Sequence, residues 1–122
     1  MERDMELIRI ILQEVKKYNN PHGLSEIPEI DGYSNSQVSY HIKILCDAGL
    51  LNAEPIPEMG TKYDDFTSIN LTWLGQDFID AANDDTIWAK AKDTFIKPGV
   101  SFTFGILLDW LKMKAKEKIG LL

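Results

Sequence analysis

Cysteine, histidine and long apolar runs are scarce in this sequence, and each shortage excludes a class of protein. A single cysteine among 122 residues cannot form an internal disulfide, which favours a reducing compartment. Two histidines and one cysteine do not provide the ligand spacing of a zinc site. No apolar stretch approaches the roughly 18 residues of a membrane-spanning helix. We therefore expect a cytoplasmic protein with no metal site and no membrane segment.

Catalytic signatures are also missing. The sequence has no phosphate-binding glycine loop, no dinucleotide fingerprint and no nucleophile elbow. Cys46 falls on the apolar side of its predicted helix and His41 at its border, so we expect two buried side chains rather than a reactive pair. Four acidic residues lack the alternation and central glycine of a calcium loop: Glu54, Glu58, Asp64 and Asp65. We predict no enzyme activity, no catalytic residues and no cofactor.

Basic residues are outnumbered, with 13 lysines and arginines against 19 acidic residues and a net charge of −6. Between residues 51 and 86 the only basic side chain is Lys62, whereas residues 87–122 contain seven lysines. DNA-binding domains are usually basic, and an acidic segment repels phosphate. The charge distribution therefore argues against nucleic-acid binding by the middle of the chain.

The most informative stretch that is present is SNSQVSYHIKILCDAGLL, residues 34–51. Ser34 and Gln37 have the spacing of a capping box, and Gly49 can close the helix in a left-handed conformation. The pattern predicts a helix over residues 35–48. Its buried stripe is Val38, Ile42, Leu45 and Cys46, with Leu45 fully buried, and its other faces carry Ser36, Gln37, Ser39, Tyr40, Lys43 and Asp47.

The remaining sequence predicts a mainly helical α+β fold with a small β-hairpin. Apolar spacing indicates a first helix over residues 2–18, and Ser25–Ile30 can form a short edge strand. Leu51–Ile56 and Phe66–Leu71 can form the hairpin, and Thr72 can cap a helix whose Gly75 packs closely against a neighbour. Further helices are predicted after residues 83–86 and from Thr103 to about Ile119. We expect a core of residues 1–83 and a helical extension, 84–122, packed on the same domain.

Two motifs resemble the winged helix-turn-helix family of DNA-binding regulators. Residues 34–51 follow the pattern of its recognition helix, and Leu71-Thr72-Trp73-Leu74-Gly75 resembles the LTxxG that begins the helix after the wing. EIPEIDG departs from the family, because Pro28 and Gly32 interrupt the position of its first helix. The whole chain is also similar to a family of small bacterial and prophage proteins of unknown function, through MERDMELIRIIL, NPHG, LTWLGQDFIDAANDDTIW and SFTFGILLDWLK.

The resemblance implies a winged helix-turn-helix fold with additional C-terminal helices and binding to double-stranded DNA, as in transcription regulators. The residues it assigns to DNA contact are Ser36, Gln37, Ser39, Tyr40 and Lys43, with Lys62 in the wing. The same helix face could simply be solvated. The alternative function is a protein–protein interaction module that has the fold without DNA binding, which the acidic wing favours. The sequence does not indicate a small-molecule ligand.

The last predicted helix has apolar residues on two neighbouring faces. One stripe contains Phe104, Leu107, Leu108 and Leu111, and the second contains Ile106, Trp110 and Met113. A helix packed on a single core needs one such stripe, so two stripes predict a homodimer through this helix. Its interface would contain Phe104, Leu107, Leu108, Trp110 and Leu111. In the alternative, a monomer, the helix is sandwiched between two others.

Overall fold

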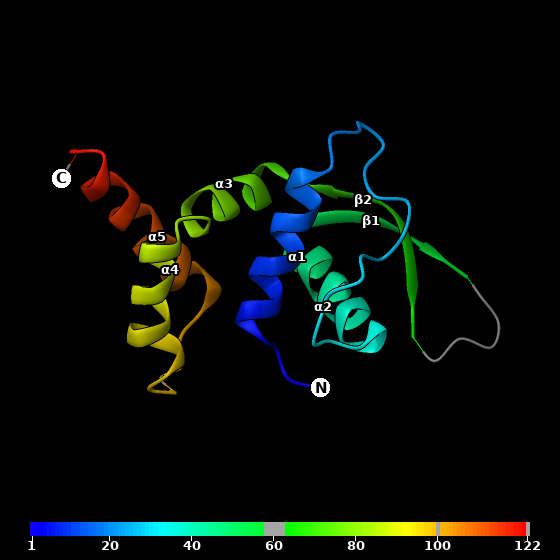
Figure 1. Ribbon diagram of the computed structural model, residues 1–122, viewed down its shortest axis with the longest axis horizontal. Coiled ribbons are helices and arrows are strands. Elements are labelled where there is room, and N and C mark those ends of the chain that lie inside the picture. Colours follow the sequence, from blue (N-terminus) through cyan, green and yellow to red (C-terminus); the bar gives the residue numbers. More distant parts are fainter. Residues whose placement is uncertain (58–62, 100, 122) are drawn as a thin grey trace. The chain divides into compact units, whose positions relative to one another are not determined.

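The computed structural model describes residues 1–57, 63–99 and 101–121, and over these residues the fold is mainly helical α+β. Five α-helices, a π-helical turn and a two-stranded antiparallel hairpin follow one another along the described chain (Figure 1). The predicted fold class is confirmed at this level. The chain forms two compact units, Met1–Gln76 and Asp77–Leu122, so the division falls inside a helix and earlier than residue 83.

The first unit begins with α1, Met5–Lys17. The Asp4 carboxylate accepts hydrogen bonds from the backbone N–H groups of Glu6 and Leu7, at 3.0 and 3.2 Å, and so caps the first turn. Lys16 and Lys17 lie in the last turn, where positive charge suits the helix dipole. The spacing predicted an apolar stripe of Met5, Ile8, Ile11, Leu12, Val15 and Tyr18, widened by Leu7 and Ile10. Leu7, Ile8, Ile11, Leu12 and Val15 are buried, whereas Met5 and Ile10 are half-buried and Tyr18 is 46% exposed.

The central helix, α2, spans Asn35–Asp47 and is closed at both ends as predicted. The Ser34 hydroxyl accepts from the N–H of Gln37, whose side-chain oxygen accepts from the N–H of Ser34 at 2.8 Å. At the other end Gly49 has φ +79°, and the N–H of Leu50 donates to the carbonyl of Leu45 at 2.9 Å, a Schellman closure. Leu45 is 2% exposed, so its predicted burial is confirmed.

The hairpin is formed by β1, Leu51–Ile56, and β2, Asp65–Leu71, as predicted within one residue. The pairing shifts between Asn52 and Glu54, so that Ser68 and Ile69 share the place opposite Ala53. At this bulge Ile69 pairs with Leu24, which lies in the segment between α1 and α2 (Figure 1).

The predicted strand Ser25–Ile30 is wrong. Leu24 exchanges two backbone hydrogen bonds with Ile69, both 3.0 Å, and the chain then leaves the sheet. Pro28 has no N–H to continue the pairing, which is consistent with this early end. Residues 25–33 contain neither strand nor helix. The segment before α2 is therefore irregular, anchored to the hairpin at one residue.

The helix α3, Trp73–Ala82, starts against the end of α2. The Thr72 hydroxyl accepts from the N–H of Gly75 at 3.0 Å and donates to the carbonyl of Gly49 at 2.6 Å. A Cβ on Gly75 would lie 2.0 Å from the carbonyl oxygen of Leu50, so no side chain fits there. Both the cap and the close packing predicted for this turn are confirmed.

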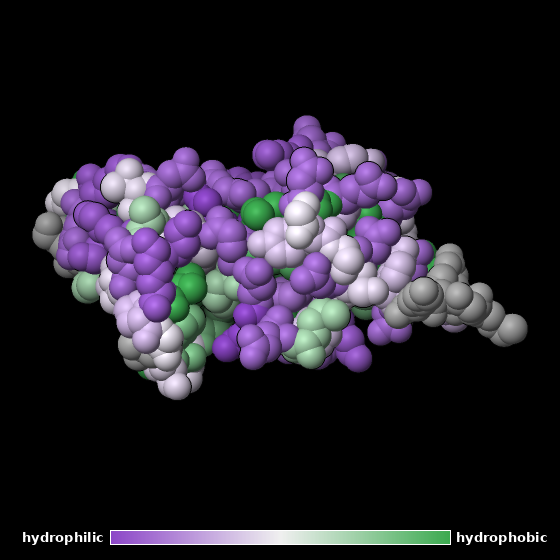
Figure 2. Space-filling model, turned by 60° about the horizontal axis from the view of Figure 1, so that its bottom comes forward, coloured by the Kyte–Doolittle hydropathy of each residue, from purple (hydrophilic) through white to green (hydrophobic). Residues whose placement is uncertain are grey.

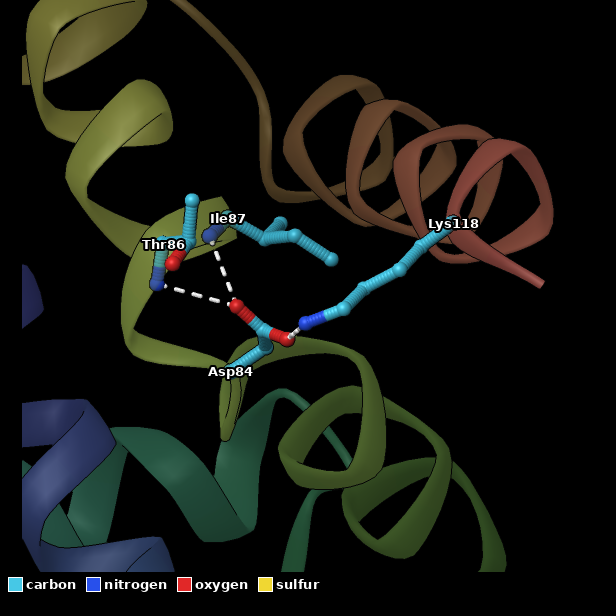
Figure 3. Close-up of polar contacts among 4 residues, drawn as sticks. All are labelled: Asp84, Thr86, Ile87 and Lys118. Carbon is cyan, nitrogen blue, oxygen red and sulfur yellow. Dashed lines mark hydrogen bonds and ion pairs between the residues drawn. The ribbon is translucent and has the colours of Figure 1, made fainter.

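The second unit contains α4, Asp85–Ala91, which continues into the π-helical turn Lys92–Ile96, and α5, Phe104–Lys118. One oxygen of Asp84 accepts from the N–H groups of Thr86 and Ile87, at 2.9 and 3.0 Å, and its other oxygen pairs with Lys118 of α5 (Figure 3). The hydrogen bond with Lys118 contributes most to holding the pKa of Asp84 below its ordinary value, and the bonds from the two backbone N–H groups act in the same direction. A single carboxylate thus joins the start of α4 to the end of α5.

The surface drawn in Figure 2 is mostly hydrophilic, and hydrophobic residues appear on this face in separate small areas. The largest exposed aromatic side chain is that of Trp73, which is 87% exposed at the first turn of α3. Among the described residues, no helix combines the length and the apolar character that crossing a bilayer requires.

Candidate nucleic-acid interface

The face of α2 opposite its buried stripe is polar. Ser36, Tyr40, Lys43 and Asp47 recur at steps of four, three and four residues, so they share one side of the helix. Lys43 and Asp47 are exposed, whereas Ser36 and Tyr40 are half-buried. We call these four residues the outward stripe. Asp47 was not among the predicted site residues, although the helical spacing alone would have included it.

Gln37 is only partly available to a ligand. It is half-buried, and its side-chain oxygen accepts the Ser34 N–H in the capping box. The side-chain amide nitrogen remains as the group that could face a partner. Gln37 therefore lies beside the outward stripe and has a structural task in the helix start.

Ser39 was predicted to lie on the exposed face, and this is wrong. It is 2% exposed, and its hydroxyl donates to the backbone carbonyl of Asp64, just before β2. The reason is that this side of α2 faces the hairpin, which local periodicity cannot reveal. Ser39 therefore links α2 to the hairpin and is not available to DNA.

His41 is 2% exposed and hydrogen-bonded on both ring nitrogens, as expected for a buried histidine. Nδ1 lies 2.7 Å from the carbonyl oxygen of Gln37, and Nε2 lies 2.8 Å from the backbone nitrogen of Asp4. Since a carbonyl only accepts and an N–H only donates, Nδ1 carries the proton and Nε2 is the acceptor. This neutral imidazole joins α2 to the residue that caps α1. Its partner lies 37 residues away, so local spacing cannot reveal the pairing.

The hairpin is acidic where it is described. Glu54 and Asp64 are exposed, and the carboxylate of Asp65 accepts the N–H of Phe66 at 2.9 Å. The side-chain amide of Asn35, at the start of α2, approaches the hydroxyl of Tyr63 at 3.5 Å. The predicted contact residue Lys62 and the acidic Glu58 lie outside the described residues.

Neither a reactive thiol nor a metal cluster is evident in the described part of the chain. Cys46 is half-buried rather than fully buried, and burial, followed by the nearby Asp47 carboxylate, raises the pKa of its thiol. The protonated, unreactive form is therefore favoured at neutral pH. No group of three or more His, Cys, Asp or Glu residues among those described is arranged to hold a metal ion.

Three residues of the predicted dimer interface, Leu107, Leu108 and Leu111, are buried within the single chain. They cannot form the surface of a dimer while the chain keeps this fold. The reason is that α5 packs within the second unit, in which it contacts α4, and these three leucines are buried there.

The other two predicted interface residues are half-buried beside aromatic rings. Phe104 lies 5.1 Å from Phe78 and Trp110 lies 5.5 Å from Phe95, measured between ring centroids. The exposed apolar side chains of α5 are Ile106 and Met113. A homodimer through α5 remains a prediction, and its interface would be the second stripe.

Comparison with known proteins identifies the family. A family model described as "Hypothetical protein (DUF2513)" matches residues 2–101. The chain belongs to this family. A DUF2513 assignment agrees with the resemblance to a family of unknown function.

A relative in Haemophilus influenzae is similar along its whole length. It is 33% identical over 129 aligned residues, which cover 98% of this chain and 97% of the relative, and it is described as an uncharacterized protein. No solved structure shows significant similarity to the chain. The geometry of its own residues is therefore what indicates a function for this DUF2513 protein.

Proposed function

We propose that this protein binds double-stranded DNA through the outward stripe of α2, as a winged-helix protein of bacterial or prophage origin. The observation that supports this is the fixed position of a helix with a free polar face. The capping box and Schellman closure fix its ends, and Ser39 and His41 fix its sides. A recognition helix needs such preorganisation, because DNA contacts must be made in one register.

The order of elements supports a winged-helix arrangement. A helix, a strand-like bridge at Leu24, the central helix and a two-stranded hairpin follow one another, as α1, Leu24, α2, β1 and β2. The difference lies in residues 25–33, where a helix-turn-helix protein has its first helix and this chain has an irregular segment. In this chain the Leu24–Ile69 bridge ties the segment to the hairpin, and the capping box closes the start of α2.

The electrostatics of the stripe limit the affinity. Lys43 is its only basic residue, and Asp47 at its far end repels phosphate. Ser36 and Tyr40 can hydrogen-bond base edges or phosphates. A single copy would bind weakly, so useful affinity requires two half-sites and hence two copies of the chain.

The test is fluorescence anisotropy with a labelled random-sequence duplex at two salt concentrations. Each neutralised phosphate contributes about −0.9 to the slope of log affinity against log salt concentration. Lys43→Gln should reduce that slope by about 1. Lys17→Gln, which removes an exposed lysine of α1, is the matched control and should leave the slope unchanged. Absence of binding at low salt, or equal effects of the two variants, would overturn the proposal.

Light scattering after size exclusion tests the second copy. A dimer through the second stripe should give twice the 13.9 kDa of one chain at tens of micromolar. Replacing Ile106 and Met113 with serine should then return the monomer mass, because both side chains are exposed apolar surface. A monomer mass for the unmodified protein would exclude a stable dimer.

The second candidate is an interaction module without DNA binding. The described hairpin residues Glu54, Asp64 and Asp65 favour it, because negative charge beside the recognition helix opposes DNA approach. In that case the anisotropy of labelled DNA stays constant at every salt concentration, while the fold and the stability are those described above.

A further inference from the structure

A cleft in the first unit opens between the irregular segment after Leu24 and the outer part of the hairpin. It has a volume of about 610 Å³, within the range of ligand-binding pockets. Apolar side chains line it from both sides: Leu24, Ile27 and Pro28 from the segment, and Ile56 from the end of β1. The cleft exists because Leu24 is the one residue of this segment that pairs with β2, so the residues after it diverge from the hairpin.

Carboxylates from two separate elements also line this cleft. Glu26 and Glu29 of the irregular segment are exposed, and Asp65 at the start of β2 is half-buried. None of the described residues that line the cleft is a lysine or an arginine. Among its described lining residues the cleft thus places apolar side chains beside carboxylates, a composition that favours a cationic, partly aliphatic side chain.

Two tyrosines complete the cleft. Tyr18, directly after α1, is 46% exposed, and Tyr63, just before β2, is half-buried. An aromatic ring face attracts a lysine or arginine head group, and the ring covers the aliphatic stem of the same side chain. Tyrosine is also enriched where proteins contact partners.

We propose that this cleft docks a lysine- or arginine-bearing segment of a partner protein. The carboxylates would pair with its charged groups, and the apolar lining and tyrosines would cover the stems. Nucleic acid does not fit, because three carboxylates would face its phosphates. The partner segment would not add a strand to β2 at Phe66, because the Phe66 N–H is already bonded to the Asp65 carboxylate. The cleft residues and the outward stripe share no member, so this docking does not depend on DNA binding.

The experiment uses the full chain and a fluorescein-labelled peptide of alternating lysine and serine, with its lysine-acetylated form as the uncharged control. Glu26→Gln combined with Glu29→Gln removes two charges from the cleft. The matched control combines Glu2→Gln with Glu14→Gln, which removes two glutamate charges outside the cleft. Glu2 is exposed before α1, and Glu14 is half-buried within α1. Fluorescence anisotropy at low salt measures the Kd of each pair, and circular dichroism confirms that both variants remain folded.

The lysine peptide should bind the unmodified chain and lose about tenfold in affinity in the cleft variant, because paired charges are removed. The matched variant should lose less than about twofold. Tyr63→Leu should weaken binding while keeping the net charge. Three results would overturn the proposal: no binding at low salt, equal losses in the two double variants, or equally tight binding of the acetylated peptide. Duplex DNA affinity in the same variants separates this outcome from that of the proposed function.

Discussion

The helices α2 and α5 are similar in length and both begin at a hydroxyl cap, yet they are held in different ways. Hydrogen bonds close both ends of α2. In addition, two buried side chains, Ser39 and His41, bond the helix to backbone groups far along the chain. α5 is also closed at both ends, by the Thr103 cap and by Gly120, which has φ +83° and is followed by a bond from the Leu121 N–H to the Lys116 carbonyl at 2.8 Å. Its side chains hold it through buried leucines and the ion pair of Lys118 with Asp84. The difference between the two helices therefore lies in their side chains: buried hydrogen bonds to remote backbone groups hold α2, whereas apolar packing and an ion pair hold α5.

Leu45→Ala should have the largest effect on this comparison. The Leu45 side chain is buried on α2, so its truncation leaves a cavity in the first unit. The Leu45 carbonyl, which accepts the closing bond of the Schellman turn, is kept in the variant. We expect a loss of about 2–5 kcal/mol in the free energy of unfolding, measured by urea denaturation. Lys43→Ala, on the outward stripe, should change it by less than about 0.5 kcal/mol. A loss below that of Lys43→Ala would contradict the placement of Leu45.

His41→Leu tests whether remote hydrogen bonds hold α2. The substitution keeps the apolar volume but leaves the Asp4 N–H and the Gln37 carbonyl without their partner. The expected loss is about 1–3 kcal/mol, together with faster hydrogen exchange of the Asp4 amide. His22→Leu, at an exposed turn position, is the control and should be close to neutral. Unchanged Asp4 exchange would mean that the bond to His41 does not contribute.

Ser34→Ala and Thr103→Ala compare the two caps directly. Each removes the side-chain oxygen that accepts a backbone N–H, from Gln37 in α2 and from Ile106 in α5. A cap of this kind contributes about 1 kcal/mol. Ser34→Ala should also weaken DNA binding if α2 is the recognition helix, whereas Thr103→Ala should not. The comparison fails if both variants affect DNA binding equally.

Asp84→Asn should have the smallest effect, and a pH-dependent one. The pKa of Asp84 is lowered from 3.8 in the folded chain, so its carboxylate stabilises the fold at neutral pH. This stabilisation begins to fall as pH drops toward 3.8 and is lost as pH falls through the lower folded pKa. Melting temperatures of the wild type and the variant should differ slightly at pH 7 and converge in acid. A difference that persists in strong acid would point to a role other than charge.

Local signals in the sequence predicted most of the fold. The Ser34–Gln37 spacing, Gly49 and the Thr72 cap are readable because each acts within a few residues. The hairpin followed from two short apolar runs separated by turn residues. These features are local in the chain, so spacing alone determines them.

The features that escaped prediction are all set by distant partners. Ser39 is buried because the carbonyl of Asp64 lies beside it, 25 residues further on. The strand after Leu24 is missing because pairing with Ile69 ends after one residue, which propensity does not reveal. Three leucines of the first α5 stripe were assigned to a dimer interface, since the sequence does not show that they are buried within the single chain. For the candidate site, the helix was predictable and the choice of its free face was only partly so.

The close approach of Gly75 to Leu50 has a consequence for how related sequences vary. A side chain at position 75 would displace the turn that ends α2, and Thr72 bonds that same turn through Gly49. The two sequence motifs, AGL and LTxxG, are therefore two halves of one contact. Among relatives, substitutions at Gly49, Thr72 and Gly75 should occur together or not at all. Lys43, which takes no part in this contact, should vary independently of them and follow only the ligand.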